Sequence, residues 1–405
     1  MRPRPPQPSA LRFRHRPTHV RVDRSALLHN LAVLRRAAGD ARIMAVLKAD
    51  AYGQGLIPIA HSLADAGVDY FGVAFLEEGI ALRQAGVEAP VLVLGGLVGY
   101  QLQHFLDYHL ELTASSAFKA QQIDAEARRL GRVARVHLKV DTGMRRIGTR
   151  PETAIKLADE LARLPGVDPV GVFTHLVGAE SPAEPTSRQQ LDRFDEVVAA
   201  MRDAGTLPPL VHVANTAALL SLPDCQRDVV RPGIGLFGVA PASRFPQADA
   251  LRPTQSVHTE IVFFKGVRKG AGVGYGHTWH APRDGWLATL PVGYGDGYPR
   301  ALSNRAQVLI GGNRYPVVGN ISMDQTMVWV GDDQFEVGEP VVLLGQQGSE
   351  TIDAWELAEH AGTIAYEILC GWASRVPRVY DDMPPSQRVD DDLPPSPGRT
   401  RGGSL

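Results

Sequence analysis

Cysteine is scarce in this sequence: its 405 residues contain only two, Cys225 and Cys370. Their spacing matches neither a zinc site nor a redox-active pair, so we expect no bound metal. Long hydrophobic runs are also lacking, because no segment approaches the roughly twenty apolar residues that cross a membrane. The arginine- and proline-rich first sixteen residues lack the apolar segment of a secretory signal. We therefore expect a cytoplasmic protein without a membrane partner.

Charge of one sign is not in excess either. The formal net charge is −2, which gives no general attraction to nucleic acid or to a membrane surface. Nucleic acid is accordingly not an expected partner. What the sequence does have is length and apolar content, since 44% hydrophobic residues can form one large core and a smaller one. We expect two folded domains.

The domain boundaries follow from shifts in composition. Residues 1–18 are predicted to be a flexible N-terminal extension, 19–250 the first domain and 251–382 the second. Prolines, aspartates, serines and glycines replace periodic apolar residues near the C-terminus, so residues 383–405 are predicted to be a disordered tail.

The first domain alternates short apolar runs with helix-compatible segments. Asp23 is a plausible N-cap for the first helix, and Gly205 lies where a later helix would end. The predicted strands are 43–48, 70–75, 91–94, 110–113, 134–140, 169–174, 210–214 and 229–236. Eight strands that alternate with helices predict an α/β fold, a (β/α)8 TIM-like barrel.

After Leu251 the pattern changes to strands joined by tight turns, which predicts a mostly β C-terminal domain. Its one convincing helix is 353–361, with Asp353 as the N-cap and Gly362 after the last turn. The strand candidates are 259–264, 286–290, 307–310 and 326–330.

Lys48 ends the first predicted strand and is followed closely by Tyr52 and Gly53. An amine that is partly desolvated at a strand end has a lowered pKa, which frees the lone pair that attacks an aldehyde. This chemistry is typical of pyridoxal phosphate. The alternative is a surface lysine whose apolar stem packs along the strand end.

Other polar residues also gather at the carboxyl ends of the predicted strands, where barrels carry their chemistry. A histidine satisfied within the core and a helix-capping asparagine remain alternatives for His175 and Asn215. The residues at strand ends are Lys48, Lys139, Asp141, His175, Asn215, Thr216 and Arg231.

The seventh and eighth loops are candidates for holding a phosphate. Asn215 and Thr216 open a helix-compatible segment, and the backbone amides from Arg231 to Gly235 are unobstructed by bulky side chains. Simple turn geometry is the alternative explanation for Gly233 and for Gly235. The glycine-rich segment 270–276 fits no nucleotide-binding spacing and is better explained as flexible backbone that presents Tyr275.

Over residues 19–380 the sequence resembles the alanine racemase family, two-domain pyridoxal phosphate enzymes with a TIM-like barrel and a C-terminal β domain. Eight segments, in the same order along the chain, carry the resemblance. They are 45–53 (AVLKADAYG), 137–144 (HLKVDTGM), 174–175 (TH), 212–216 (HVANT), 231–234 (RPGI), 274–276 (GYG), 290–294 (LPVGY) and 322–325 (SMDQ).

The resemblance implies a racemase with two bases on opposite faces of the substrate. Lys48 would bind the cofactor and serve the D-enantiomer, and Tyr275 from the partner subunit of a homodimer would serve the L-enantiomer. A phenol acts near neutral pH only in a cationic or hydrogen-bonding setting, which His175 and Arg231 are expected to supply. A solvated tyrosine on a turn is the alternative.

The resemblance also assigns the remaining site residues. Arg231 would face the pyridine nitrogen without giving up its proton, which disfavours transamination; an arginine that only braces its loop through an ion pair is the alternative. Lys139 would be either carbamylated or unmodified and paired with a carboxylate. Tyr294 would restrict the pocket entrance. The phosphate and cofactor residues are Tyr52, Arg146, His175, Asn215, Thr216, Gly233, Ile234 and Tyr366; Arg146 and the Met323 amide would bind the substrate carboxylate; His212 and Asp324 would support the site.

Alanine is the expected substrate because aromatic rings at Tyr294 and Tyr366 exclude long side chains, with slow turnover of serine expected as well. D-alanine would supply peptidoglycan. A racemase for another small amino acid, a barrel-type decarboxylase and a non-catalytic cofactor carrier are the alternatives. Departures from the family pattern at Asn320 and Ser322 concern substrate affinity more than reaction type. Three further departures, Asp50, Gln54 and Arg145, flank Lys48 and Arg146.

Overall fold

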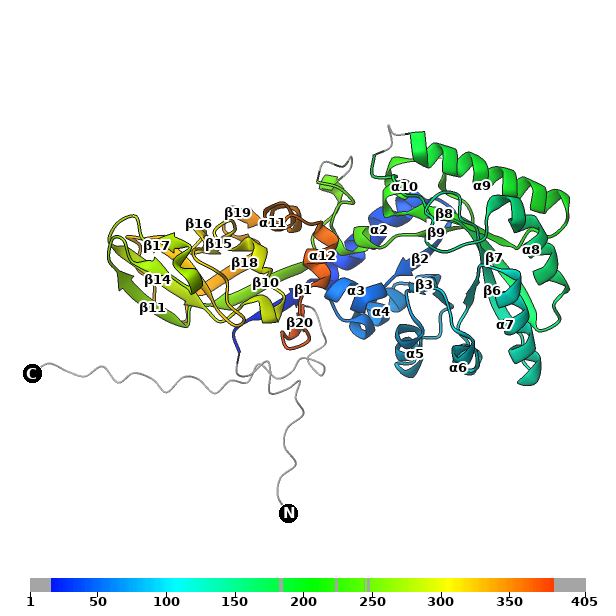
Figure 1. The fold of residues 1–405 in the computed structure, drawn as a ribbon, viewed down its shortest axis with the longest axis horizontal. Helices are drawn as coiled ribbons and strands as arrows, with labels where there is room; N and C mark the ends of the chain where they lie inside the picture. The colour runs from blue at the N-terminus through cyan, green and yellow to red at the C-terminus, as the bar shows by residue number, and fades with distance from the viewer. Residues whose placement is uncertain (1–15, 182–184, 223–224, 244, 246–247, 382–405) are drawn as a thin grey trace, which may run out of the picture.

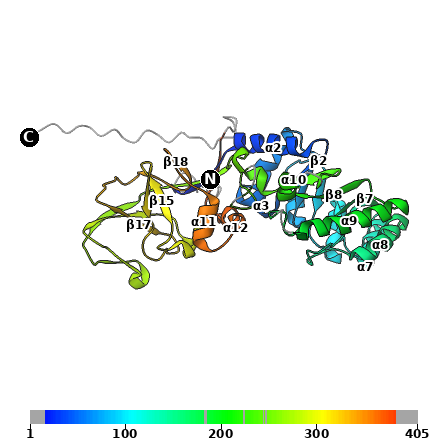
Figure 2. The ribbon, with the colours of Figure 1, turned by 90° about the horizontal axis from the view of Figure 1, so that it is seen from above.

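The computed structural model describes residues 16–181, 185–222, 225–243, 245 and 248–381. A helix-rich lobe and a β-rich lobe lie along the long axis of the molecule (Figure 1). The same two lobes are seen from above, with helix α12 (Ala365–Cys370) where they meet (Figure 2). The predicted tail 383–405 and most of the predicted extension 1–18 lie outside the described residues.

The helix-rich lobe is the predicted barrel. Its eight strands are parallel, in the order β4-β3-β2-β9-β8-β7-β6-β5. A parallel bridge between Leu92 and Glu111 joins the two ends of this order, so the ring is nearly closed. The strands are β2 (Arg42–Val46), β3 (Tyr70–Val73), β4 (Val91–Val93), β5 (Leu112–Ala114), β6 (Ala134–Lys139), β7 (Val167–Phe173), β8 (Leu210–Asn215) and β9 (Val229–Arg231).

Helices surround the barrel. The first follows from its sequence: the Asp23 carboxylate accepts a hydrogen bond from the Ala26 amide (2.9 Å), and Leu27, Leu31 and Leu34 are buried on one face. The others begin at residues that follow the strands. The helices are α2 (Arg24–Ala38), α3 (Lys48–Gly53), α4 (Leu56–Asp65), α5 (Leu76–Gln84), α6 (Leu102–Asp107), α7 (Ala117–Arg129), α8 (Pro151–Arg163), α9 (Pro185–Asp203) and α10 (Thr216–Ser221).

Most of the predicted barrel strands are shorter than expected, and two of these differences concern residues of the predicted site. The eighth ends at Arg231 because Pro232 and Gly233 interrupt it, and the segment Ile234–Phe237 forms a 3-10 turn. The first ends at Val46, so Lys48 opens the following turn instead of closing the strand. Both changes keep the polar residues at the same mouth of the barrel.

The β-rich lobe contains the C-terminal domain. Helix α11 (Ala354–Ala361) has the predicted caps, Asp353 and Gly362, whereas α12 was not predicted. The predicted strand 259–264 is divided between two strands that belong to different sheets. The strands are β10 (Gln255–Glu260), β11 (Phe263–Val267), β12 (Gly272–Val273), β13 (Trp279–His280), β14 (Gly285–Leu290), β15 (Gln307–Ile310), β16 (Asn313–Pro316), β17 (Thr326–Gly331), β18 (Pro340–Gln347), β19 (Glu350–Ile352) and β20 (Arg378–Tyr380).

The sheet of the C-terminal domain also contains a strand from the start of the chain. Strand β1 (His19–Val22) pairs antiparallel with β10 and parallel with β20, with Val20 and Val22 fully buried. Our expected boundary assigned residues from 19 onward to the barrel, whereas these four residues lie in the other sheet. Among the described helices, none has the length and apolar character needed to cross a membrane.

Candidate active site

The loop after β2 carries Lys48 on an unusual backbone. Residues 49–52 have φ values of 56°, 55°, 52° and 56°, a left-handed turn that costs roughly 1–2 kcal/mol for each L-residue. Hydrogen bonds hold it: the Glu78 carboxylate accepts from the Ala49 amide (2.7 Å), and Asp50 accepts from the Leu56 amide (2.7 Å). Glu78 also accepts from the Ala74 amide (2.8 Å), so the loops after β2 and β3 are joined.

Basic side chains converge at this mouth of the barrel. Burial lowers the pKa of Lys48, and the charge of Arg146 lowers it further. Burial likewise holds the pKa of His175 well below its usual value, assisted by Arg231, Lys139 and Arg146. Because these groups repel one another, the site is electrostatically suited to an anionic ligand.

Lys139 is the most perturbed of the amines. Its side chain is buried, and burial together with Arg231 and Arg146 lowers its pKa to about 7. Its Nζ lies 4.5 Å from the centre of the Phe173 ring. Among the described residues no carboxylate pairs with it, since Asp141 accepts instead from the amides of Gly143 and Arg145 (3.0 and 2.9 Å). The structure does not show the predicted pairing of an unmodified Lys139 with a carboxylate.

Arg231 is buried and held by neutral acceptors. Its Nη2 donates to the carbonyl oxygens of Thr174 (2.7 Å) and Val213 (2.9 Å), and its Nη1 donates to Nδ1 of His212 (3.0 Å). Burial lowers its pKa to about 9, which leaves the guanidinium charged at neutral pH. Within the described chain, Nε and one hydrogen of Nη1 have no partner, so they are left for a group in the site. Arg231 therefore does not brace its loop through an ion pair.

His212 continues a polar chain into the barrel. Its ring stacks on Phe173 (centroids 4.7 Å apart, 7° between planes) and its Nε2 lies 2.9 Å from Nδ1 of His137. Nε2 of His137 lies 2.8 Å from the carboxylate of Glu111. Glu78, Glu111 and Phe173 were not predicted as site residues, and His137 was noted only within a motif. A glutamate inside an apolar strand candidate was the available signal, because a buried carboxylate requires partners.

Tyr52, Gly233 and Thr216 form a tight cradle beside Lys48. A Cβ atom on Gly233 would lie 2.3 Å from the Tyr52 hydroxyl oxygen, so only glycine fits there. The Thr216 hydroxyl accepts from the amides of Gly233 (2.9 Å) and Gly235 (3.3 Å). Tyr366 of α12 closes the cradle, with its ring 6.3 Å from that of Tyr52.

Asn215 is a helix cap, which was the alternative to a direct role in the site. Its side chain accepts from the Ala218 amide (2.9 Å) and caps α10. Ile234 is buried in the 3-10 turn after Gly233. Both therefore fix the backbone of the cradle.

The remaining predicted residues lie on the C-terminal domain, in a separate group. Tyr275, Tyr294 and Met323 are 75%, 43% and 53% exposed. Asn320 donates to the Tyr275 carbonyl oxygen (2.7 Å). No hydrogen bond, ion pair or ring contact among the described residues joins this group to the barrel mouth.

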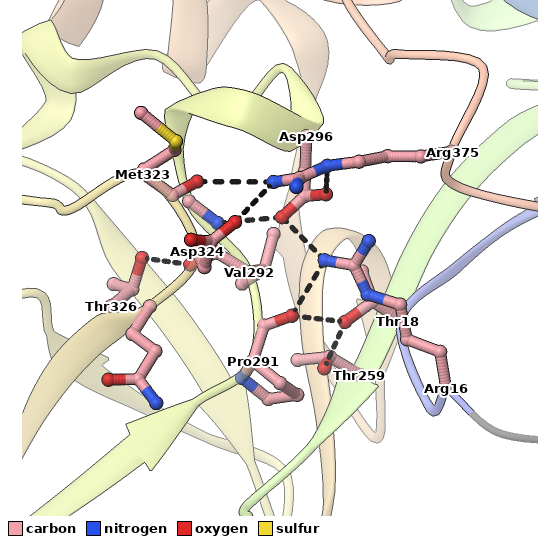
Figure 3. Close-up of polar contacts among 12 residues, drawn as sticks. Arg16, Thr18, Thr259, Pro291, Val292, Asp296, Met323, Asp324, Thr326 and Arg375 are labelled. Carbon is pink, nitrogen blue, oxygen red and sulfur yellow. Dashed lines mark hydrogen bonds and ion pairs between the residues drawn. The ribbon is translucent and has the colours of Figure 1, made fainter.

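Ionic contacts tie the loops that carry Tyr294 and Met323 to each other (Figure 3). The buried carboxylate of Asp296 lies 2.5 Å from Nη2 of Arg16 and 2.6 Å from Nε of Arg375. Nη2 of Arg375 in turn donates to Asp324 (2.8 Å) and to the Met323 carbonyl oxygen (3.3 Å). Met323 and Asp324 were predicted as site residues, whereas Arg16, Asp296 and Arg375 were not, because these three are distant from one another in sequence.

Comparison with known proteins agrees with this geometry. Residues 22–241 match the model of the alanine racemase N-terminal domain, and 254–380 match that of the C-terminal domain. The chain is 47% identical to an alanine racemase of Symbiobacterium thermophilum over 366 residues, which cover 90% of this chain and 97% of that protein.

Solved structures show the same fold. An alanine racemase from Streptomyces coelicolor superposes with a TM-score of 0.88 at 35% identity, covering 93% of this chain and 100% of the other. A histidine racemase from Leuconostoc mesenteroides, with a TM-score of 0.83 and 31% identity, covers 90% of this chain and 98% of its own. The fold thus supports more than one racemase substrate. This chain belongs to the alanine racemase family.

Proposed function

We propose that this protein interconverts L-alanine and D-alanine with pyridoxal phosphate attached to Lys48. The observation that carries the proposal is the convergence of Lys48, Lys139, Arg146 and Arg231 at the mouth of the barrel, where burial and the charges of the arginines lower the pKa of both lysines. A cofactor phosphate and a substrate carboxylate supply the negative charge that such a site lacks.

The residues present fit this cofactor. Gly233 leaves the space beside the Tyr52 hydroxyl that a Cβ would fill, and Thr216 already gathers two backbone amides there. Tyr52, Thr216, Gly233, Ile234 and Tyr366 would hold the phosphate. The N–H groups of Arg231 for which the described residues provide no partner suit a ring nitrogen, which accepts a hydrogen bond. A barrel-type decarboxylase would normally present a carboxylate to the ring nitrogen, so Arg231 at this position disfavours the decarboxylase alternative.

The bound cofactor would make the α-proton of an attached amino acid acidic. Lys48 would exchange that proton on one face, because burial lowers its pKa and so favours the neutral amine that a base requires. The Tyr275 phenol of a second subunit would exchange it on the opposite face. Arg146 and the Met323 amide would hold the substrate carboxylate.

A homodimer with shared sites is part of the proposal. In the single chain Tyr275, Tyr294 and Met323 are exposed on the C-terminal domain and make no polar contact with Lys48 among the described residues. A second copy would bring this face to the barrel mouth, and the first copy would do the same in return.

Alanine is proposed as the substrate because Tyr366 and Tyr294 leave room for a methyl group but exclude a long side chain. Because a structurally similar protein is a histidine racemase, the rates with alanine and with histidine have to be compared directly. Turnover in the cytoplasm and supply of D-alanine to peptidoglycan remain predictions.

The test is the holoenzyme in deuterated buffer with L-alanine, D-alanine, serine and histidine as separate substrates. We expect loss of optical activity with α-deuterium uptake, fastest for alanine. Carbon dioxide release would indicate a decarboxylase, and equal efficiency with histidine would overturn the substrate assignment. Borohydride reduction followed by peptide mass spectrometry should place the cofactor on Lys48; a tag elsewhere would overturn the site.

A further inference from the structure

A continuous polar chain runs from Arg231 into the interior of the barrel. Four side chains form it: Arg231, His212, His137 and Glu111, with successive distances of 3.0, 2.9 and 2.8 Å. All four are at most 4% exposed. They come from β9, β8, β6 and the residue before β5, so the chain crosses the barrel.

The direction of every hydrogen bond in this chain is fixed by its two ends. A guanidinium only donates, so Nδ1 of His212 must accept from Arg231 and its proton must be on Nε2. That proton is donated to Nδ1 of His137, which places the proton of His137 on Nε2 as well. Nε2 of His137 then donates to Glu111, and an ionised carboxylate only accepts. A donor-only end and an acceptor-only end therefore select the same tautomer for both imidazoles.

We propose that Glu111 is a positioning residue for Arg231, acting through the fixed Nε2–H tautomers of His137 and His212. Its carboxylate polarises both neutral rings and keeps Nδ1 of His212 an acceptor. Arg231 is thereby held in the orientation that its three neutral acceptors set, although no carboxylate contacts it among the described residues. The role toward Arg231 rests on the proposed function, whereas the tautomers do not.

The surroundings of the chain support this role. Phe173 lies parallel to the His212 ring, which restricts rotation of the imidazole about its side-chain bond. At the far end Arg135 pairs with the second oxygen of Glu111 (2.7 Å), and hydrogen bonds from His137 and Arg135 lower the pKa of the carboxyl below its usual range. Arg135 lines a cavity of about 590 Å³ at the amino-terminal mouth, so this end of the chain is close to solvent.

The first experiment needs no substitution. Nitrogen-15 NMR of the histidine-labelled full chain, assigned with single-histidine variants, should show His137 and His212 as neutral Nε2–H tautomers, with and without cofactor. A Nδ1–H tautomer or a protonated ring at either position would overturn the proposal. This outcome is independent of which amino acid the enzyme converts.

Two substitutions at Glu111 separate its hydrogen-bond acceptor from its charge. Glu111→Gln keeps an oxygen for His137, and Arg135, half-exposed, can turn to water. We expect wild-type tautomers and a kcat within about threefold of wild type. Glu111→Leu leaves the Nε2–H of His137 without an acceptor, or it shifts both imidazoles to the Nδ1–H tautomer. In the second case the Nδ1–H of His212 would face an N–H of Arg231, so two donors would oppose each other.

For Glu111→Leu we expect mixed tautomers at His212 and a kcat about tenfold lower, with an unchanged KM. Glu126→Leu is the matched control, because it removes a partly exposed carboxylate from its pair with Arg129 (2.6 Å). Wild-type tautomers and kcat in Glu111→Leu would overturn the proposal. If that variant does not fold, a Nδ1–H tautomer at His212 in the wild type or in Glu111→Gln would still overturn the proposal. Racemisation absent from the wild type, with the tautomers as expected, would refute the proposed function alone.

Discussion

Nε of Arg375 lies 2.6 Å from the carboxylate of Asp296, a side chain with no exposed surface. The same carboxylate accepts from the Gly293 amide (3.0 Å) and pairs with Arg16. One buried anion thus organises two cations and the turn that carries Tyr294. Through Arg375 it also reaches the Met323 loop.

Asp296→Asn should weaken both substrate binding and folding. Two partly exposed arginines would lose their buried counter-charge, and losing hydrogen bonds to a charged group costs roughly 1.5–3 kcal/mol. We expect KM for alanine to rise more than kcat falls, because the Met323 loop loses its anchor. Urea unfolding and steady-state kinetics measure the two effects. Arg21→Gln, which breaks an exposed pair with Asp381, is the control and should cost under about 1 kcal/mol. Equal effects of the two variants would contradict the assignment.

Tyr275→Phe should remove proton exchange on one face while leaving the fold intact, because the ring is exposed and only the hydroxyl is lost. We expect racemisation to fall by roughly 10²–10⁴. The two starting enantiomers should differ in α-deuterium uptake, with D-alanine still exchanging through Lys48. Undiminished turnover in both directions would exclude Tyr275 as a base.

The buried amine of Lys139 makes stability depend on pH. Its pKa in the folded chain is about 7, below the ordinary lysine value of 10.5. Between these values the unfolded chain binds more protons, so stability rises with pH in that window. Relative to Lys139→Met, the cofactor-free wild type should gain about 2 kcal/mol from pH 7 to pH 9 in urea unfolding without carbon dioxide.

Lys156→Met, at an exposed lysine on α8, is the control for the Lys139 measurement and should show no such trend. If the difference in unfolding free energy between the wild type and Lys139→Met does not change with pH, the pKa of Lys139 is not depressed. Bicarbonate labelled with carbon-13 can be added afterwards to detect carbamylation.

Gly233→Ala should weaken cofactor binding, because the new methyl group would lie 2.3 Å from the Tyr52 hydroxyl oxygen. We expect at least about tenfold lower affinity in a spectroscopic titration. Adding Tyr52→Phe removes the clashing oxygen and should restore part of the loss. Gly266→Ala, where the nearest atom is 3.8 Å away, should leave binding unchanged. No rescue by the double variant would refute the steric account.

Activity should require two chains in contact, since no polar contact joins Tyr275 to the barrel mouth of its own chain within the part that the structure describes. Specific activity is expected to fall on dilution in step with the dimer fraction measured by ultracentrifugation. Mixing inactive Lys48→Ala with inactive Tyr275→Phe tests the sharing directly. Each mixed dimer has one site with both defects and one intact site, so activity should return. A fully active monomer would end this proposal.

The barrel could be predicted because its strands are apolar runs whose ends are polar. Lys48, Lys139 and His175 were found since position along a strand predicts the mouth at which a residue lies. The path of β1 could not be predicted, because Val20 and Val22 fit the face of either sheet. Helix α12 was missed because six residues give little periodic signal.

The polar chain was missed for another reason. Glu111, His137 and His212 are separated by 26 and 75 residues along the sequence, and their meeting depends on strand register. The left-handed turn after Lys48 was also beyond prediction, because alanine, aspartate and tyrosine rarely adopt positive φ. The hydrogen bonds that Glu78 accepts from the Ala49 and Ala74 amides stabilise this turn, but they can be identified only from the folded structure.

The location of β1 sets an order for assembly during translation. Residues 19–22 leave the ribosome before the barrel, but their partner β10 begins at residue 255 and β20 at residue 378. Strand β1 must therefore remain unpaired while the whole barrel is synthesised. The sheet that contains β1 is completed only after β20 has been synthesised. A separately expressed fragment that starts at residue 251 would lack an interior strand, so complementation with a peptide spanning 16–24 is the way to obtain that domain folded.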